Sequence, residues 1–254
     1  TTLAVSLVDS AGGQSVQVYT TMNRQRSYGA DVIARIQASC DGKGEELQRL
    51  IREDLLTGIR EVLEKAHVQE AQVGEIAIAG NTTMGHLLMG LSCKTLGVAP
   101  FTPVDISLRD HVAFEEVFGM DEYHIPVLLL PGISTYVGAD ITAGMLSLDF
   151  VKRDGIAVLI DLGTNGEMAV GNREKILVTS TAAGPAFEGG NISCGVGSVA
   201  GAISDVTIDG TNVRYETIGG QPPVGICGTG AIAVTAELLR NEWIDETGLL
   251  DEDY

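Results

Sequence analysis

The strongest candidate for chemistry is the segment 161–166, Asp-Leu-Gly-Thr-Asn-Gly. It follows the apolar run 156–160, which we expect to be a buried strand that delivers Asp161 to its end. A glycine-rich turn can offer backbone N–H groups to phosphate oxygens, because glycine allows close approach and positive φ. Asp161 can hold Mg²⁺ through water. We therefore predict a phosphate site formed by backbone N–H groups of Gly163, Thr164, Asn165 and Gly166, with side-chain donors from Thr164 and Asn165.

A plainer explanation exists for the same segment. Asn-Gly is a favoured pair at the centre of a type I′ turn, so Asn165-Gly166 can simply join two strands of a hairpin. The turn considered alone favours this explanation. The choice between the two depends on the rest of the chain.

Asp140 is the second candidate. It lies in Gly138-Ala139-Asp140, where we expect a helix to begin after the apolar run 125–130 and Pro131-Gly132. In an ATPase such a carboxylate can orient the attacking water or hold Mg²⁺. The alternative is an aspartate that satisfies free N–H groups at the helix start, and both roles can hold together.

Other segments can line the same cleft. Gly80-Asn81-Thr82-Thr83 opens a predicted helix, where we expect Thr82 to cap and Asn81 to face the cleft. The glycine-rich run 184–190 can line the cleft through Gly184, with Glu188 facing a metal or a partner; a tight bend near the core is the alternative. Three glycines before another predicted helix suit close approach to a nucleotide, although this pattern is weak by itself: Gly225, Gly228 and Gly230.

The composition narrows the possible functions. The 254 residues include 16 Lys and Arg against 34 Asp and Glu, a net charge of -18. Such a surface repels nucleic-acid phosphates and anionic lipid, so we expect neither a nucleic-acid nor a membrane role. The four cysteines form no C-x-x-C pair, zinc motif or iron–sulfur spacing. Without a signal peptide or a span of about twenty apolar residues, the protein is expected to be cytoplasmic.

The elements that position these residues form two similar halves. Apolar residues recur at helical spacing from 45 to 66, which predicts a long amphipathic helix. Strands are expected at 3–8, 16–20, 75–79, 125–130, 156–160, 167–170, 175–181, 205–208 and 213–218, and further helices after 81, at 137–148 and at 229–241. Residues 92–122 are expected to be an irregular connection. This pattern predicts an α/β protein with a duplicated unit, a boundary near 149–155 and a cleft between the halves.

Several segments resemble known families. Asp161 to Gly166 resembles the second phosphate loop of the acetate/sugar kinase, heat-shock chaperone and actin superfamily, and Thr1-Thr2 resembles the end of its first phosphate loop. Four further segments are similar to the C-terminal region of the reductive activators of corrinoid proteins: 80–84, 131–141, 183–192 and 225–230. The resemblance covers nearly the whole chain.

The resemblance implies two RNase-H-like domains, 1–150 and 151–254, around a cleft for ATP and Mg²⁺. It implies that Thr1 and Thr2 contact the nucleotide as the end of the first phosphate loop, whose aspartate and glycine would lie upstream of this chain. It also implies that part of the adenosine pocket lies beyond Tyr254. We therefore expect both ends of the chain to be cut. By the same resemblance, ATP hydrolysis drives reduction of Co(II) to Co(I) in a corrinoid iron–sulfur protein. Electrons would come from a [2Fe-2S] domain outside this chain, and a homodimer is plausible.

Two alternatives stay open. A small-molecule kinase of the same superfamily would need a polar acceptor pocket in the first domain, and the sequence shows no convincing set of carboxylates and amides for a sugar. A non-catalytic module that binds a partner would retain nucleotide without turnover.

Overall fold

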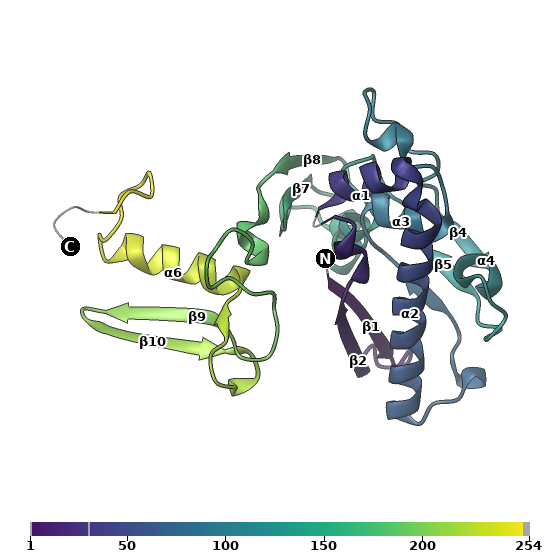
Figure 1. The fold of residues 1–254 in the computed structure, drawn as a ribbon, viewed down its shortest axis with the longest axis horizontal. Coiled ribbons are helices and arrows are strands. Elements are labelled where there is room, and N and C mark those ends of the chain that lie inside the picture. Colours follow the sequence, from purple (N-terminus) through teal and green to yellow (C-terminus); the bar gives the residue numbers. More distant parts are fainter. Residues whose placement is uncertain (1, 30, 251–254) are drawn as a thin grey trace. The chain divides into compact units, whose positions relative to one another are not determined.

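The computed structural model describes residues 2–29 and 31–250. The chain divides into two compact units, and each is described here by itself (Figure 1). The first unit comprises the described residues of Thr1–Leu159 together with Ala169–Thr179, and the second comprises Ile160–Met168 with those of Ser180–Tyr254. Thr1, a predicted nucleotide contact, lies outside the described residues, whereas Thr2 begins the first strand.

A hairpin packed on a long helix opens the first unit. Strands β1 (Thr2–Val8) and β2 (Ser15–Met22) pair antiparallel, and α2 (Gly44–Ala66) lies against them (Figure 1). The helix expected from 45 to 66 is therefore confirmed. Gly58 allows the close contact, because a Cβ there would lie 2.6 Å from Cγ2 of Val5.

A three-stranded sheet completes the centre of this unit. Its order is β3 (Ile76–Ile78), β5 (Val127–Leu129) and β4 (Arg109–Val112), with β3 parallel and β4 antiparallel to β5. Besides α2, the first unit has four shorter α-helices: α1 (Val32–Ala38), α3 (Thr82–Met89), α4 (Phe114–Phe118) and α5 (Ala139–Ser147). Short 3₁₀ or π turns lie at Arg24–Ser27, Ser39–Lys43, Glu70–Gln72, Lys94–Leu96 and Phe150–Lys152.

The prediction of an irregular connection over 92–122 was wrong in part, because this stretch contains β4 and α4. The strand is polar, Arg-Asp-His-Val, and so shows no alternation of apolar residues. The helix has only five residues, too few for a helical period to be visible in the sequence. Its apolar side chains enter the core beside the buried face of α2, in a cluster that includes Ile51, Leu56, Ile59, Leu63, Phe114, Val117, Phe118 and Val127.

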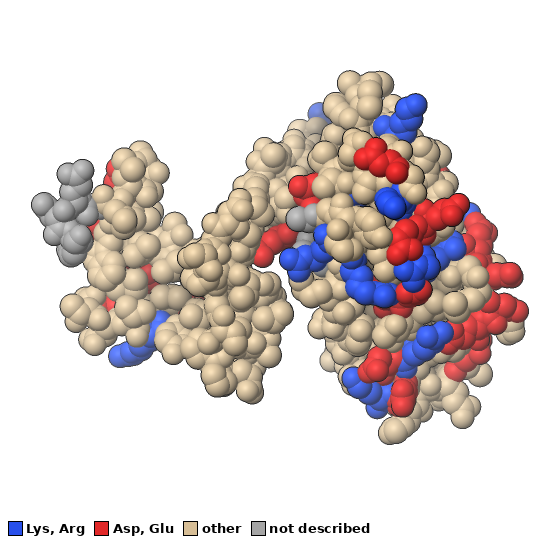
Figure 2. Space-filling view, viewed as in Figure 1, with Lys and Arg blue, Asp and Glu red and all other residues tan. Residues whose placement is uncertain are grey.

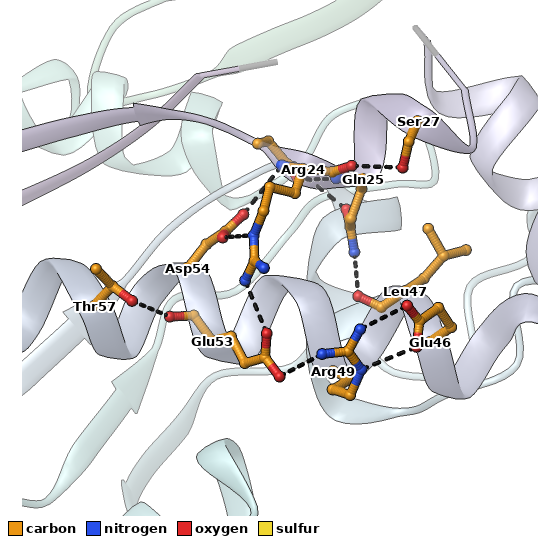
Figure 3. Close-up of polar contacts among 10 residues, drawn as sticks. Arg24, Gln25, Ser27, Glu46, Leu47, Arg49, Glu53, Asp54 and Thr57 are labelled. Atoms are coloured by element: carbon orange, nitrogen blue, oxygen red, sulfur yellow. Dashed lines mark hydrogen bonds and ion pairs between the residues drawn. The ribbon is translucent and has the colours of Figure 1, made fainter.

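Ion pairs from Arg24 join the turn after β2 to the middle of α2 (Figure 3). The buried carboxylate of Asp54 accepts hydrogen bonds from the backbone N–H and the guanidinium of Arg24, and it raises the pKa of that guanidinium. Arg49 bridges Glu46 and Glu53 on the exposed side of the helix. Exposed pairs of this kind stabilise a fold by at most about 1 kcal/mol each, so the partly buried Arg24–Asp54 pair carries most of the anchoring.

A second three-stranded sheet contributes residues to both units. Its order is β6 (Ala157–Leu162), β7 (Asn165–Gly171) and β8 (Ile176–Ala182). In the first unit, Leu159 and Val178 pack against a buried cluster that includes Ile141 of α5. β6 was expected to be buried, but Val158 is 57% exposed. An unbroken apolar run does not reveal whether one or both faces of a strand are covered, which explains the error.

The second unit has a hairpin covered by one helix. Strands β9 (Ala202–Asp209) and β10 (Asn212–Thr217) pair antiparallel, and β11 (Gly225–Ile226) pairs parallel to β9. The hairpin expected between these strands is confirmed, but its turn is Gly210-Thr211 and not Asp209-Gly210, because Asp209 ends β9 and pairs with Asn212; φ at Gly210 is 57°. Helix α6 (Gly228–Arg240) lies against β9, where the carboxylate of Glu237 accepts a 2.7 Å hydrogen bond from the Ile208 N–H. Two 3₁₀ turns, Pro185–Glu188 and Ile218–Gly220, complete the unit.

Surface charge is unevenly distributed on the face drawn in Figure 2. Acidic and basic side chains intermix over the part that contains α2, and few charges appear over the part that contains β9, β10 and α6. Within the described residues, no helix is both long and apolar enough to cross a membrane.

One buried histidine has a fixed protonation state. Nδ1 of His86 lies 2.8 Å from the Thr82 carbonyl oxygen, which can only accept, and Nε2 accepts a 2.9 Å hydrogen bond from the Val104 N–H. The neutral ring with its proton on Nδ1 satisfies both bonds, whereas a second proton on Nε2 would face a donor. Burial lowers the pKa of His86 and outweighs the hydrogen bond to the Thr82 carbonyl and the charge of Asp105, which both act to raise it.

We predict that the first unit loses stability below neutral pH. The unfolded chain binds a proton at His86 near pH 6.5 and the folded chain does not, so the free energy of unfolding falls by up to about 1.4 kcal/mol per pH unit below that value. Denaturant titrations from pH 7.5 to 5 measure this slope. His86→Gln should flatten it, whereas the exposed control His124→Gln should not. Equal slopes in wild type and His86→Gln would contradict the assignment.

Candidate functional site

The predicted phosphate turn is shorter than the sequence indicated. β6 continues through Asp161 to Leu162 and β7 begins at Asn165, so that only Gly163 and Thr164 form the turn. The Gly163 N–H donates a 2.9 Å hydrogen bond to the Asn165 carbonyl oxygen. Asp161 is exposed, one residue before the end of its strand.

The type I′ explanation of this turn was wrong. That turn requires positive φ at both central residues. Among the described residues, positive φ occurs at neither Asn165 nor Gly166, which are the first two residues of β7. The segment is therefore not an ordinary Asn-Gly hairpin, and phosphate binding by Asn165 and Gly166 stays a prediction.

A second loop holds the turn in place. The Thr164 carbonyl oxygen accepts hydrogen bonds from the N–H groups of Ala183 at 3.2 Å and Gly184 at 2.9 Å. The Thr164 hydroxyl lies 2.8 Å from a carboxylate oxygen of Glu188. Gly184 has φ of 83°, a conformation that a side chain would strain. The run 184–190, expected either to line a cleft or to bend near the core, is thus a loop bonded to the predicted phosphate turn.

The contact made by Ala183 could not be found from the sequence. A backbone N–H carries no residue-specific signal, and alanine belongs to none of the residue types that indicate chemistry. Glu188 was a candidate, but its partner Thr164 lies 24 residues away in the sequence.

The three glycines before α6 meet protein backbone. A Cβ at Gly228 would lie 1.7 Å from the Phe187 carbonyl oxygen, and one at Gly230 would lie 2.2 Å from the Ile203 carbonyl oxygen. Gly225 packs in the same way on the Cys194 carbonyl oxygen, at 2.5 Å. Internal packing therefore accounts for these glycines, and their contact with a nucleotide stays a prediction.

In the first unit, the segment that opens α5 at Asp140 contacts the loop of Gly80 and Asn81, where the parallel strands β3 and β5 end. Asp140 lies in the first turn of α5, and its carboxylate accepts a 3.0 Å hydrogen bond from the Ile141 N–H. The Gly80 carbonyl oxygen accepts from the N–H groups of Ala139 at 2.9 Å and Asp140 at 3.3 Å. Asp140 thus supports a helix start, as the alternative interpretation expected, and its catalytic role stays a prediction.

The expectation that Thr82 caps α3 was wrong, whereas nucleotide contact by Asn81 stays a prediction. Asn81 is the N-cap of α3, with its side-chain oxygen 2.9 Å from the Met84 nitrogen. The Thr82 hydroxyl donates instead to the Ser134 carbonyl oxygen at 2.7 Å. Asn81 also lines a cavity of about 70 Å³, which has room for a few water molecules but not for a nucleotide.

The available carboxylates suit magnesium better than a cluster metal. In the described part of the chain, no three His, Cys, Asp or Glu side chains gather as a metal site. Mg²⁺ needs no such group, because it keeps several waters and takes one or two carboxylates together with phosphate oxygens. Asp161 and Glu188 of the second unit fit that need. The four free cysteines do not fit a [2Fe-2S] cluster, which requires four converging thiolates.

Comparison with known families covers nearly the whole chain. A family model described as "RACo middle region" matches residues 1–153, and one described as "C-terminal domain of RACo the ASKHA domain" matches residues 155–254. A solved structure called "Reductive activator for corrinoid,iron-sulfur protein" superimposes with a TM-score of 0.87 at 34% identity, over 100% of this chain and 41% of that one. The expected α/β fold of the kinase, chaperone and actin type is confirmed.

Two curated proteins are similar in sequence. The "Corrinoid activation enzyme RamQ" of Eubacterium limosum is 36% identical over 95% of this chain and 41% of its own length. The "[Co(II) methylated amine-specific corrinoid protein] reductase" of Methanosarcina barkeri is 29% identical over 76% of this chain and 42% of its own length. The chain thus spans about two fifths of the relatives it matches.

We predict that Gly228→Ala destabilises the second unit by at least about 2 kcal/mol, because the new methyl group would overlap the Phe187 carbonyl. The matched control is Gly85→Ala, also at a helical glycine but with open space at the Cβ position, which should be neutral or stabilising by about 1 kcal/mol. Thermal unfolding followed by circular dichroism measures both changes. An unaltered melting temperature for Gly228→Ala would contradict the described packing of α6 on the loop.

Proposed function

This chain belongs to the RACo family, and on that premise we propose that it is the ATP-binding and ATP-hydrolysing core of a cytoplasmic reductive activator of a corrinoid protein. The observation that carries the proposal is the clamped turn of Gly163 and Thr164 immediately after Asp161. Its backbone is fixed by hydrogen bonds from Ala183 and Gly184, as a preorganised phosphate site requires. The names of the relatives support the corrinoid partner.

Magnesium and phosphate would be bound by different groups of the second unit. The backbone of the turn and the side chain of Asn165 would contact the phosphates, and Asp161 would hold Mg²⁺ through water. The ion would neutralise charge that develops on the transferred phosphoryl group, which is the main requirement of phosphoryl transfer. Asp140, in the first turn of α5, would orient the attacking water or a water bound to the metal.

Hydrolysis would drive an electron transfer that does not proceed unaided. Reduction of Co(II) to Co(I) in a corrinoid is uphill from ordinary cellular donors. A conformational change linked to ATP can expose the cobalt or change its ligation, and so make the reduction favourable. By the resemblance to the reductive activators, the electrons would come from a [2Fe-2S] domain outside these 254 residues.

The test is ATP hydrolysis by the intact protein with Mg²⁺, with and without a corrinoid iron–sulfur protein in the Co(II) state. We expect the partner to stimulate turnover. Asp161→Ala should lower the stimulated rate by about a hundredfold, because it removes the carboxylate that holds the metal.

The matched control is Asp205→Ala, which removes an exposed carboxylate from β9 in the same unit and should leave the rate unchanged. Hydrolysis that ignores the corrinoid protein, together with phosphoryl transfer to a metabolite, would instead identify a kinase. Nucleotide binding without any turnover would identify a binding module.

A further inference from the structure

The proton of the Thr164 hydroxyl is committed to Glu188. The two oxygens, Oγ1 and Oε2, are 2.8 Å apart, and an ionised carboxylate can only accept. A hydroxyl has a single proton to donate. While this bond persists, Thr164 can offer lone pairs to a ligand at the turn but no hydrogen bond. The sequence alone had suggested Thr164 as a donor to phosphate.

The loop geometry holds the carboxylate against the turn. Glu188 is the last residue of the 3₁₀ turn that begins at Pro185, and this turn is closed by a 2.8 Å hydrogen bond from the Gly190 N–H to the Pro185 carbonyl oxygen. The second carboxylate oxygen lies 3.4 Å from the position that a Cβ of Gly163 would occupy. Both residues of the turn therefore face the same negative charge.

We infer that Glu188 is a positioning residue that makes the turn select nucleotide bound to a divalent cation over free nucleotide. Its carboxylate orients Oγ1 of Thr164 so that the lone pairs face the ligand, and oxygen lone pairs are what Mg²⁺ binds. The same negative charge repels a bare triphosphate and tolerates one whose charge the cation has reduced. The inference rests on the proposed function, because it requires phosphate to bind at this turn.

The test measures affinity, not turnover. A non-hydrolysable ATP analogue is titrated by calorimetry into the intact protein, first with excess Mg²⁺ and then with EDTA. Glu188→Ala should weaken binding with Mg²⁺ by about tenfold, the loss expected for one hydrogen bond to a charged group. Binding in EDTA should be unchanged or tighter, so that the preference for the metal complex shrinks.

Two further variants separate positioning from simple structural support. Glu188→Gln keeps an oxygen that accepts the Thr164 proton, so its affinity with Mg²⁺ should stay within about threefold of wild type. Thr164→Val removes the hydroxyl and should lose as much as Glu188→Ala, with no further loss when the two are combined. Glu216→Ala, at an exposed carboxylate of β10, is the matched control and should change nothing.

Two results would overturn the inference: an unchanged ratio of affinities with Mg²⁺ and EDTA in Glu188→Ala, or additive losses in the double variant. A wild-type protein that binds the analogue under neither condition would contradict the proposed function itself. If the wild type binds the analogue but prefers the metal complex no more strongly than the Glu188→Ala variant does, only the inference about Glu188 fails.

Discussion

The second unit depends on one acceptor, the carbonyl oxygen of Thr164. Because it receives the N–H groups of Ala183 and Gly184, the turn after β6 cannot move without the loop that follows β8. That loop contacts the start of α6 at Gly228, where there is no room for even a methyl group. A ligand that displaced the turn would therefore displace α6 and, through Glu237, the hairpin beneath it. If nucleotide binds at this turn, as we propose, this series of contacts would link its binding to the position of α6.

The first unit uses the same device. There the Gly80 carbonyl oxygen accepts two successive N–H groups, from Ala139 and Asp140, at the start of α5. Gly138 makes the approach possible, because a Cβ there would lie 2.6 Å from the Asn81 Cα. In each unit, one carbonyl oxygen in the loop after a strand accepts two successive N–H groups. It thereby fixes the segment that donates them. The backbone, rather than a set of charged side chains, sets the position of both candidate aspartates.

The sequence predicted these elements unevenly, for physical reasons. The long helix α2 was predictable because its apolar residues repeat over 23 residues, whereas the five residues of α4 are too few to show a period. Glycine at 228 indicated a close backbone approach but not what approaches, and the partner proved to be Phe187. The bond between Thr164 and Glu188 depends on tertiary folding, so residue types near the turn could indicate phosphate chemistry without revealing which hydroxyl proton is already used.

We propose that ATP hydrolysis on this fold drives cobalt reduction in a partner protein. Low-spin Co(II) is paramagnetic and Co(I) is not, so electron paramagnetic resonance follows the reduction directly. The intact, chemically reduced protein is mixed with a Co(II) corrinoid iron–sulfur protein, Mg²⁺ and either ATP or a non-hydrolysable analogue. We expect the Co(II) signal to disappear with ATP and to persist with the analogue. Loss of the signal at equal rates with ATP, with the analogue and without nucleotide would show that hydrolysis does not drive the reduction.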